Sequence, residues 1–417
     1  MGRNAATTGT QTEEGIWDVG QKSDQPRARQ MVTIATQTDE SFLLNSKELN
    51  RQLLPGLHDE ITLVHIVPKL PWWAFYVLAC VCRSWKRVVR SGKVHDARID
   101  SSSTETLVGI VAMPNQPGRK DDQVVVYSMS EKLSWQLPPF PASGGIPESC
   151  QRVTLDGKIY VLGGRAKLYD IHTSEVWVFD LVGQKGWEKL ANMHEPRCDF
   201  GSAVKDGKIF VFGGFHRGSE VYEPKDDIWV PISSMVSVRV GHKVATFGEE
   251  LIVYGGYCFN RDSNDCFEIL LGSDLPSGLE IYHPEQDDWR VDESVGCVLS
   301  TVLVFTAHEK FYLLGEDGID FYDDDKNAWV VVHSNSFAAL GPEYEYSNKQ
   351  VETVGVLNFN DELLLAVTIH GLQDRGFLLQ STSFGSDDET IEWQKENISL
   401  RISGSYFSSP LIGLIHL

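Results

Sequence analysis

The sequence predicts a mainly β protein, a six-bladed β-propeller preceded by a small three-helix segment and a disordered amino-terminal arm. The first observation behind this prediction is an internal repeat. Residues 156–164 read DGKIYVLGG, residues 206–214 read DGKIFVFGG, and residues 249–256 read EELIVYGG. Four further residues recur at a displacement of 42 positions, namely Trp187, Met193, Arg197 and Gly213, which reappear as Trp229, Met235, Arg239 and Gly255. Chance rarely produces such a set, so the chain contains a repeat array.

The second observation is the spacing of tryptophans and glycine pairs. Tryptophans end the predicted units at intervals of 40 to 64 residues, and these are Trp135, Trp187, Trp229, Trp289, Trp329 and Trp393. Glycine pairs follow the second strand of three units, at Gly163-Gly164, Gly213-Gly214 and Gly255-Gly256. This arrangement resembles the kelch repeat, which implies six four-stranded blades. The glycines permit positive φ where the strand leaves the sheet, and each tryptophan packs between neighbouring blades.

The first unit lacks a first strand. Its strand-like runs begin at Leu107–Met113 and continue through Val124–Met129 to Trp135, and the apolar stretch Ser405–Leu417 follows the last tryptophan. We expect this final stretch to supply the missing strand and close the ring, because an open ring would expose a sheet edge. Residues 106–417 therefore form the predicted propeller.

Helical periodicity precedes the repeats, over residues 51–92. Leu57, Ile61 and Val64 recur at helical spacing, and Pro68 is expected to end this first helix. A second helix is predicted from Trp72 to Cys80, and a third contains Trp85. Residues 93–105 have the composition of a linker, and the polar residues 1–50 are predicted to be a disordered arm.

Composition and charge exclude several classes of function. Residues 51–98 hold eight Lys/Arg and three Asp/Glu, so this segment is basic. Residues 99–417 carry a net charge of −24, and the whole chain carries −21. An acidic surface repels phosphate backbones, so we expect no nucleic-acid binding. The seven cysteines lack metal-like spacing, and no apolar run is long enough to span a membrane. We expect a protein of the cytoplasm, the nucleus or both, without metal or cofactor.

The helical segment resembles an F-box. Its opening Leu54-Pro55, its closing Val81-Cys82-Arg83-Ser84-Trp85 and the apolar positions between them match that motif, while Pro68 and the pair Trp72-Trp73 depart from it. The resemblance implies a substrate-recognition subunit that binds a Skp-type adaptor and, through it, cullin and RING subunits. The adaptor-binding residues expected from the motif are Leu54, Pro55, Leu57, Ile61, Leu63, Ile66, Leu78, Val81, Cys82 and Trp85. An F-box before kelch repeats is similar to plant F-box/kelch-repeat proteins.

The target is expected to bind the propeller face that carries the loops between second and third strands and the connections between blades. The longest of these loops runs from Tyr257 to Gly278. Candidate target-binding residues are Arg165, Arg197, His216, Arg217, Arg239, Tyr257, Asn260 and Arg261. Arg197 and Arg239 have two interpretations: they hold a target peptide, or they bond to carbonyls of neighbouring blades. The second is favoured, because most such groups satisfy backbone acceptors.

A short motif occurs twice in the arm, as Thr10-Gln11-Thr12 and Thr36-Gln37-Thr38, each followed by two acidic residues. It resembles the peptide that dynein-type light chains bind as an added edge strand. Two copies would suit a dimeric partner through avidity. Coincidence in a Thr/Gln-rich arm is the alternative.

Two rival functions remain at this stage. A kelch propeller also resembles the fold of a copper oxidase, but the sequence contains no catalytic signature such as HExxH, a phosphate loop or Gly-x-Ser-x-Gly. We therefore expect a non-catalytic protein. The other rival is a kelch interaction scaffold that acts without ubiquitin transfer.

Overall fold

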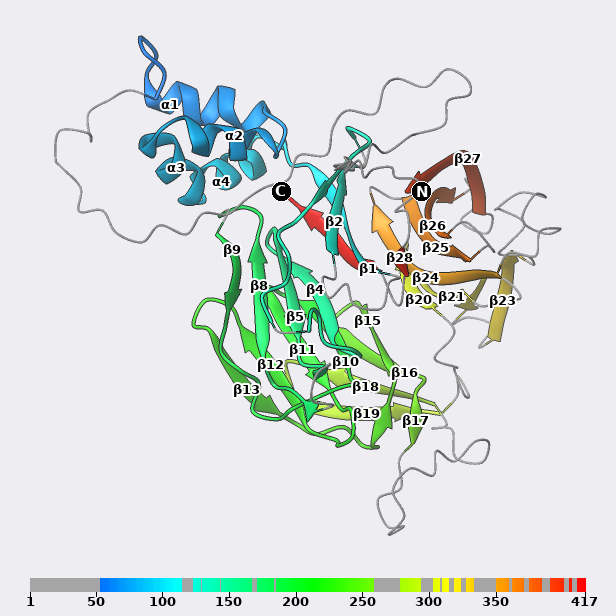
Figure 1. Ribbon diagram of the computed structural model, residues 1–417. Helices are drawn as coiled ribbons and strands as arrows, with labels where there is room; N and C mark the ends of the chain where they lie inside the picture. The colour runs from blue at the N-terminus through cyan, green and yellow to red at the C-terminus, as the bar shows by residue number, and fades with distance from the viewer. Residues whose placement is uncertain are drawn as a thin grey trace, which may run out of the picture. The chain divides into compact units, whose positions relative to one another are not determined.

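In its described residues, the computed structural model has six antiparallel sheets of four or five strands, two further two-stranded sheets and a helical segment that precedes them in the chain (Figure 1). The residues that it describes are 53–114, 123–128, 130–142, 144–166, 171–183, 185–258, 278–293, 303–307, 310–314, 319–323, 328–333, 350–359, 362–370, 375–384, 391–400, 405–406 and 411–417. The predicted arm, residues 1–50, lies outside them. The predicted fold class is confirmed, since each of the six sheets is a propeller blade.

Blades 2 to 6 each consist of four strands that follow one another in the sheet. Their bounds are, for blade 2, β4 (Gln151–Leu155), β5 (Lys158–Leu162), β8 (Val176–Asp180) and β9 (Gly186–Lys189); for blade 3, β10 (Gly201–Lys205), β11 (Lys208–Phe212), β12 (Ser219–Glu223) and β13 (Ile228–Ile232); for blade 4, β15 (Lys243–Phe247), β16 (Glu250–Tyr254), β18 (Leu279–His283) and β19 (Asp288–Asp292); for blade 5, β20 (Leu303–Ala307), β21 (Lys310–Leu314), β22 (Ile319–Asp323) and β23 (Ala328–His333); and for blade 6, β24 (Gln350–Phe359), β25 (Glu362–His370), β26 (Arg375–Phe384) and β27 (Ile391–Leu400). Two short pairs lie in the loops: β6 (Arg165–Ala166) with β7 (Ile171–His172), and β14 (Arg239–Val240) with β17 (Tyr257–Cys258).

Blade 1 joins the two ends of the propeller. It contains β1 (Thr106–Pro114), β2 (Gln123–Ser128) and β3 (Leu133–Gln136), and β1 also pairs with β28 (Ser405–Tyr406) and β29 (Leu411–His416). Leu107 lies opposite Ile415 in the antiparallel β1–β29 ladder, which is the pairing that the sequence predicts. The innermost strands contact each other in the cyclic order β29, β4, β10, β15, β20, β24 and back to β29. The ring is therefore closed.

Three blade tryptophans tie their strands to the preceding inter-blade segments, and the fourth with a described side chain, Trp135, is buried in the core of blade 1. The indole N–H donates to Pro138 O from Trp187 (3.0 Å), to Ala191 O from Trp229 (3.1 Å) and to Ser233 O from Trp289 (2.9 Å). Burying an aromatic ring while pairing its N–H is the usual way a tryptophan stabilises a core. Trp329 and Trp393 lie in β23 and β27, but their side chains are outside the described part of the chain.

The glycine pairs are required by close backbone approach. Gly214 has a φ of +100°, and a Cβ there would lie 2.9 Å from the carbonyl oxygen of Cys198. The other predicted glycines, Gly163, Gly164, Gly213, Gly255 and Gly256, also have positive φ. An L side chain at Gly214 would be strained both by φ and by the contact.

The helical segment contains one helix more than the sequence predicts. Its first helix begins as α1 (Asp59–Ile61), continues in π-helical geometry over Thr62–Ile66 and ends in a 3-10 turn, Val67–Lys69, at Pro68 as expected; it is followed by α2 (Ala74–Val81), α3 (Arg83–Arg90) and α4 (Lys93–Asp100). Helix α4 occupies most of the predicted linker 93–105, so that assignment is corrected. The helix forms because Val94 and Arg98, four positions apart, are both buried on one side. None of the helices in the described ranges is long and apolar enough to cross a bilayer.

Candidate functional site

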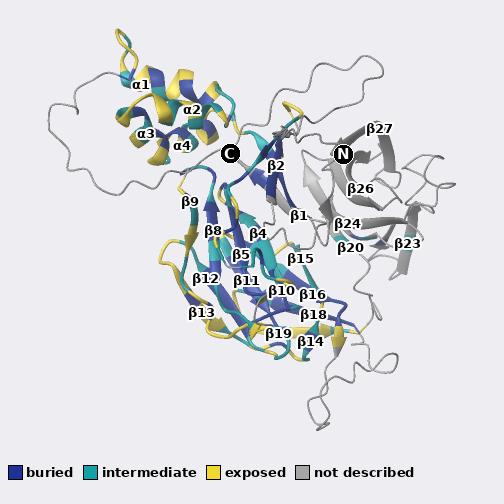
Figure 2. Cartoon of the chain, viewed as in Figure 1, coloured by how far each residue is buried: buried dark blue, intermediate teal, exposed yellow. Residues whose placement is uncertain are grey.

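Figure 2 shows exposed residues along the helical segment, and several of them are apolar. Of the predicted adaptor-binding residues, six are exposed: Leu54, Pro55, Ile61, Ile66, Val81 and Cys82. Val81 is the most exposed of the large apolar ones, at 64%. Val64 and Val77 are exposed as well, although the motif did not single them out; their helical spacing from Ile61 and Val81 was the available signal. These eight residues are called the helical apolar surface below.

The other predicted adaptor-binding residues lie further inside. Leu57, Leu63 and Leu78 are half-buried. Trp85 is only 4% exposed and packs with Leu53, Val67 and Val94 in the core of the helical segment. Trp85 is therefore corrected from a surface contact to a core residue, since its large ring is what the short helices bury together.

The loop face of the propeller holds the predicted target-binding residues that the structure describes. Arg165, in β6, is 44% exposed and forms an ion pair of 2.9 Å with Glu148. Tyr257, in β17, is 45% exposed. Arg217 is exposed and donates from Nη1 to the carbonyl oxygen of Val236 (3.4 Å). Asn260 and Arg261 lie outside the described residues.

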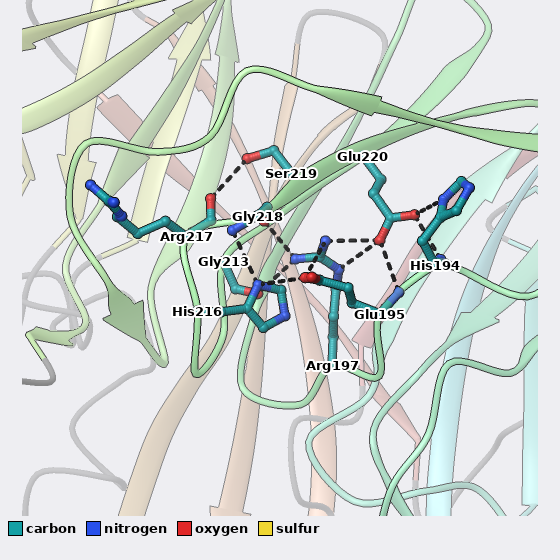
Figure 3. Close-up of polar contacts among 9 residues, drawn as sticks. All are labelled: His194, Glu195, Arg197, Gly213, His216, Arg217, Gly218, Ser219 and Glu220. Atoms are coloured by element: carbon teal, nitrogen blue, oxygen red, sulfur yellow. Dashed lines mark hydrogen bonds and ion pairs between the residues drawn. The ribbon is translucent and has the colours of Figure 1, made fainter. Parts of the chain in front are cut away.

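Arg197 and Arg239 do not reach the surface, because each is 1% exposed and fully engaged within its own blade. Arg197 donates from Nη2 to Glu220 Oε1 (2.8 Å) and from Nη1 to the carbonyl oxygens of Gly213 (2.9 Å) and Gly218 (2.6 Å), as Figure 3 shows. Arg239 bonds to the equivalent partners through other atoms: Nε donates to Glu280 Oε1 (2.7 Å), Nη1 to Gly255 O (3.2 Å) and Nη2 to Gly278 O (3.2 Å). Both arginines therefore have the structural role that the sequence favoured, although the carbonyls are those of the same blade and not of a neighbouring one, and their inclusion among the target-binding candidates is wrong.

The two glutamates are functional residues that the sequence did not predict. Glu220 and Glu280 occupy the second position of β12 and β18, and each is followed two residues later by a buried tyrosine. The signal that would have found them is this repeated Glu-x-Tyr, in Glu220-Val221-Tyr222 and Glu280-Ile281-Tyr282. A buried ion pair is tolerated only when its remaining donors and acceptors are also bonded, and the glycine carbonyls supply this for the guanidinium groups.

The carboxylate of Glu220 is held ionised. Burial would raise its pKa, but hydrogen bonds from the His194 backbone and from Arg197 outweigh burial, so the pKa lies below its ordinary value. His194 Nδ1 lies 2.7 Å from the second carboxylate oxygen, and its side chain is 54% exposed. The buried pair is thus linked to the solvent-facing side of the loop.

His216 lies beside this pair at the edge of the loop face (Figure 3). Its Nδ1 accepts from Gly218 N–H at 3.1 Å and lies 3.0 Å from Glu195 Oε2. Burial and the nearby Arg197 lower the pKa of His216. Among the residues described, no group of three His, Cys, Asp or Glu side chains is placed to hold a metal ion.

His242 lies just before β15 of blade 4 and bonds to β10 of blade 3. Its ring is 3% exposed, Nδ1 donates to Arg239 O (3.0 Å), and Nε2 accepts from Gly201 N–H (3.1 Å). Both bonds together fix the neutral tautomer with the proton on Nδ1. Burial, reinforced by Arg239, lowers the pKa of His242 to about 4.

The comparisons with known proteins agree with this architecture. The kelch motif family matches residues 153–194 and 196–236. An F-box/kelch-repeat protein of Arabidopsis thaliana is 28% identical over 221 residues, covering 51% of this chain and 57% of that protein. The F-box/kelch-repeat protein SKIP30 of the same plant is 28% identical over 61% of this chain and 73% of its own length. Kelch-like protein 15 of Danio rerio is 29% identical over 38% of this chain and 29% of its own length.

The repeat matches and the six closed blades define a kelch-type β-propeller protein. The plant proteins to which the chain is similar are F-box/kelch-repeat proteins, and this chain also has a helical segment ahead of its propeller. The chain spans just over half the length of the first of these relatives.

We predict that His242 makes stability depend on pH between about 6.5 and 4. The pKa of His242 in the folded protein is below the unfolded value of about 6.5, so as the pH is lowered the unfolded chain binds the extra proton first. The free energy of unfolding therefore decreases as the pH decreases, by up to about 1.4 kcal/mol per pH unit. Denaturant titrations of the wild type and His242→Gln from pH 4 to 7.5 measure this slope. The variant is expected to lose it, and an unchanged slope would contradict the assignment; His283→Gln, at a half-buried His, is the control.

Proposed function

We propose that this protein is a substrate-recognition subunit of a Skp/cullin/F-box ubiquitin ligase. In this function the helical segment binds the Skp-type adaptor, and the propeller binds the protein to be ubiquitylated. The observation that carries the proposal is the helical apolar surface, together with its attachment to a propeller of the kelch type.

The helical apolar surface supports protein binding for a simple physical reason. Single exposed apolar residues are ordinary, but a group such as Ile61, Val64, Val77 and Val81 on one short segment, with exposures from 44% to 64%, marks an interface. Apolar residues buried at the centre of such an interface provide most of its affinity. The excess of positive charge around these helices favours an acidic partner.

The contribution of such a subunit to catalysis is proximity. Ubiquitin transfer would be performed by other subunits, and this chain would hold the acceptor lysine of a target near them, which converts an encounter between two molecules into a reaction within one assembly. No residue of the chain needs to take part in bond formation. A non-catalytic role is therefore part of the proposal.

Target recognition is proposed for the exposed loop residues Arg165, Arg217 and Tyr257, with His216 at their edge. Tyrosine and arginine are the side chains that most often dominate protein interfaces. The buried Arg197 and Arg239 would act behind them by fixing the loops, so the face is preorganised before a target arrives.

The adaptor interface is tested by the double change Ile61→Asp/Val81→Asp. Two carboxylates placed in an apolar contact would be desolvated without partners, so we expect at least a tenfold loss of affinity for a Skp-type adaptor in calorimetry, with little change in melting temperature. Ile228→Asp, at a residue of β13 that is 46% exposed, is the matched control. Undiminished adaptor binding would favour a kelch scaffold that acts without ubiquitin transfer. Trp85 is unsuitable for this test because its removal would unfold the helices.

The target face is tested by comparing proteins captured by the full chain and by Arg217→Glu/Tyr257→Ala while degradation is blocked. We expect the variant to retain adaptor binding, because both side chains are exposed and their replacement leaves the core intact. The amount of one set of captured proteins is expected to decrease at least tenfold. Lys225→Glu is the control, as another exposed position in blade 3. Equal capture by both proteins would place recognition elsewhere.

A dynein-type light chain is proposed as a second partner, through Thr10-Gln11-Thr12 and Thr36-Gln37-Thr38. Supporting this is the recurrence of the motif with an acidic pair after each copy. Calorimetric titration of a peptide spanning residues 30–42 into such a light chain is expected to give a dissociation constant in the micromolar range. This corresponds to a free energy of binding of about −8 kcal/mol. A peptide with Gln37→Ala should bind at least tenfold more weakly. If neither peptide binds, the motif is a coincidence.

A further inference from the structure

Glu105 lies where the end of the helical segment meets the first blade, and its backbone belongs to the closure of the ring. Its N–H donates to Leu417 O at 2.7 Å, and its carbonyl accepts from Leu417 N–H at 2.8 Å. These two bonds extend the ladder in which Thr106 lies opposite His416. Glu105 and Leu417 thus form the last residue pair of the ladder between the β1 and β29 segments.

The side chain of Glu105 belongs to the helical segment. It is 9% exposed, and Oε2 accepts from the backbone N–H of Trp72 (3.2 Å) and lies 3.8 Å from Nη2 of Arg98 in α4. The other oxygen accepts from Ser128 Oγ in β2 at 2.7 Å. One carboxylate therefore connects two parts of the helical segment to blade 1.

Arg98 is also bonded where the helical segment meets blade 1. It is 3% exposed, and it donates from Nε to Ser103 O (3.2 Å) and from Nη1 to Leu70 O (3.1 Å). Burial lowers the pKa of Arg98, and the carboxylate of Glu105 opposes that effect. Two buried groups of opposite charge depend on each other, because either one alone would be left desolvated without a counter-charge.

An apolar contact runs parallel to this polar one. Trp72 is 1% exposed and meets Trp135 of β3 edge to face, with ring centroids 5.0 Å apart. The cluster around it also contains Leu107, Ile415 and Leu417, so the side chains that close the ring pack in the same core as a residue of the helical segment.

We propose that docking of the helical segment and closure of the propeller are a single coupled event, with Glu105 as the positioning residue that joins them. The helical segment is then not a tethered module, and loosening either side loosens the other by the same factor, as linkage requires. The inference does not depend on which partner binds the helical apolar surface, since it concerns other residues of the segment, which are buried.

Hydrogen exchange of the full-length protein tests this coupling in both directions. In Trp72→Ala and in Glu105→Gln, we expect the β29 amides to exchange at least tenfold faster than in the wild type, while the β11–β12 amides of blade 3 remain unchanged. In Ile415→Ala, a change made only in the strand, we expect the α2 and α4 amides to exchange at least tenfold faster. Glu105→Gln keeps the size of the side chain, so it reports the loss of charge if a truncation unfolds the protein.

Glu131→Gln is the matched control, because Glu131 accepts from the indole N–H of Trp73 at 3.2 Å in an exposed contact of the same kind. We expect it to change exchange by less than twofold at β29. Three outcomes would overturn the proposal: unchanged β29 exchange in Trp72→Ala and Glu105→Gln, an effect of Ile415→Ala confined to the sheet, or equal acceleration in all blades.

Discussion

The pairing of β29 with β1 is the constraint on which the rest of this structure depends. It makes the last strand of the chain part of the first blade, so the six sheets form a ring without a free inner edge. It also fixes Glu105 opposite Leu417, beside the helices. The site where the propeller closes is therefore also the site where the helical segment is held, and the two ends of the described chain stabilise one another.

Within the ring, two buried ion pairs fix the loops of neighbouring blades. Arg197–Glu220 and Arg239–Glu280 occupy equivalent places in blades 3 and 4, and glycine carbonyls accept hydrogen bonds from both guanidinium groups. Such pairs stabilise little by themselves, but removing one partner is costly. Their bonds tie the backbone on either side of each loop together, while Arg217 and Tyr257 remain exposed on the same loops.

The helical segment has two sides with different tasks. Trp72 packs against Trp135 of blade 1 and Arg98 pairs with Glu105 just before β1, whereas Ile61 and Val81 remain exposed. A small helical unit rarely buries enough surface to be stable alone. Here part of that requirement is met by the propeller, and the surface that remains is available for the adaptor interface proposed above. The arrangement would hold adaptor and target in a defined geometry.

The sequence by itself determined the repeat, the six blades, the missing first strand and the three predicted helices. Strand alternation and glycine pairs can be read within one unit, and the tryptophans recur from one unit to the next, so these patterns are visible without knowing the tertiary contacts. Tertiary structure decided which polar and apolar residues face inward. Arg197 meets a glutamate 23 positions away, Trp85 enters the helical core, and residues 93–100 form α4 rather than a linker. Burial depends on what distant segments bring to the same place, and the local sequence around Trp85 or Val94 does not show which segments those are.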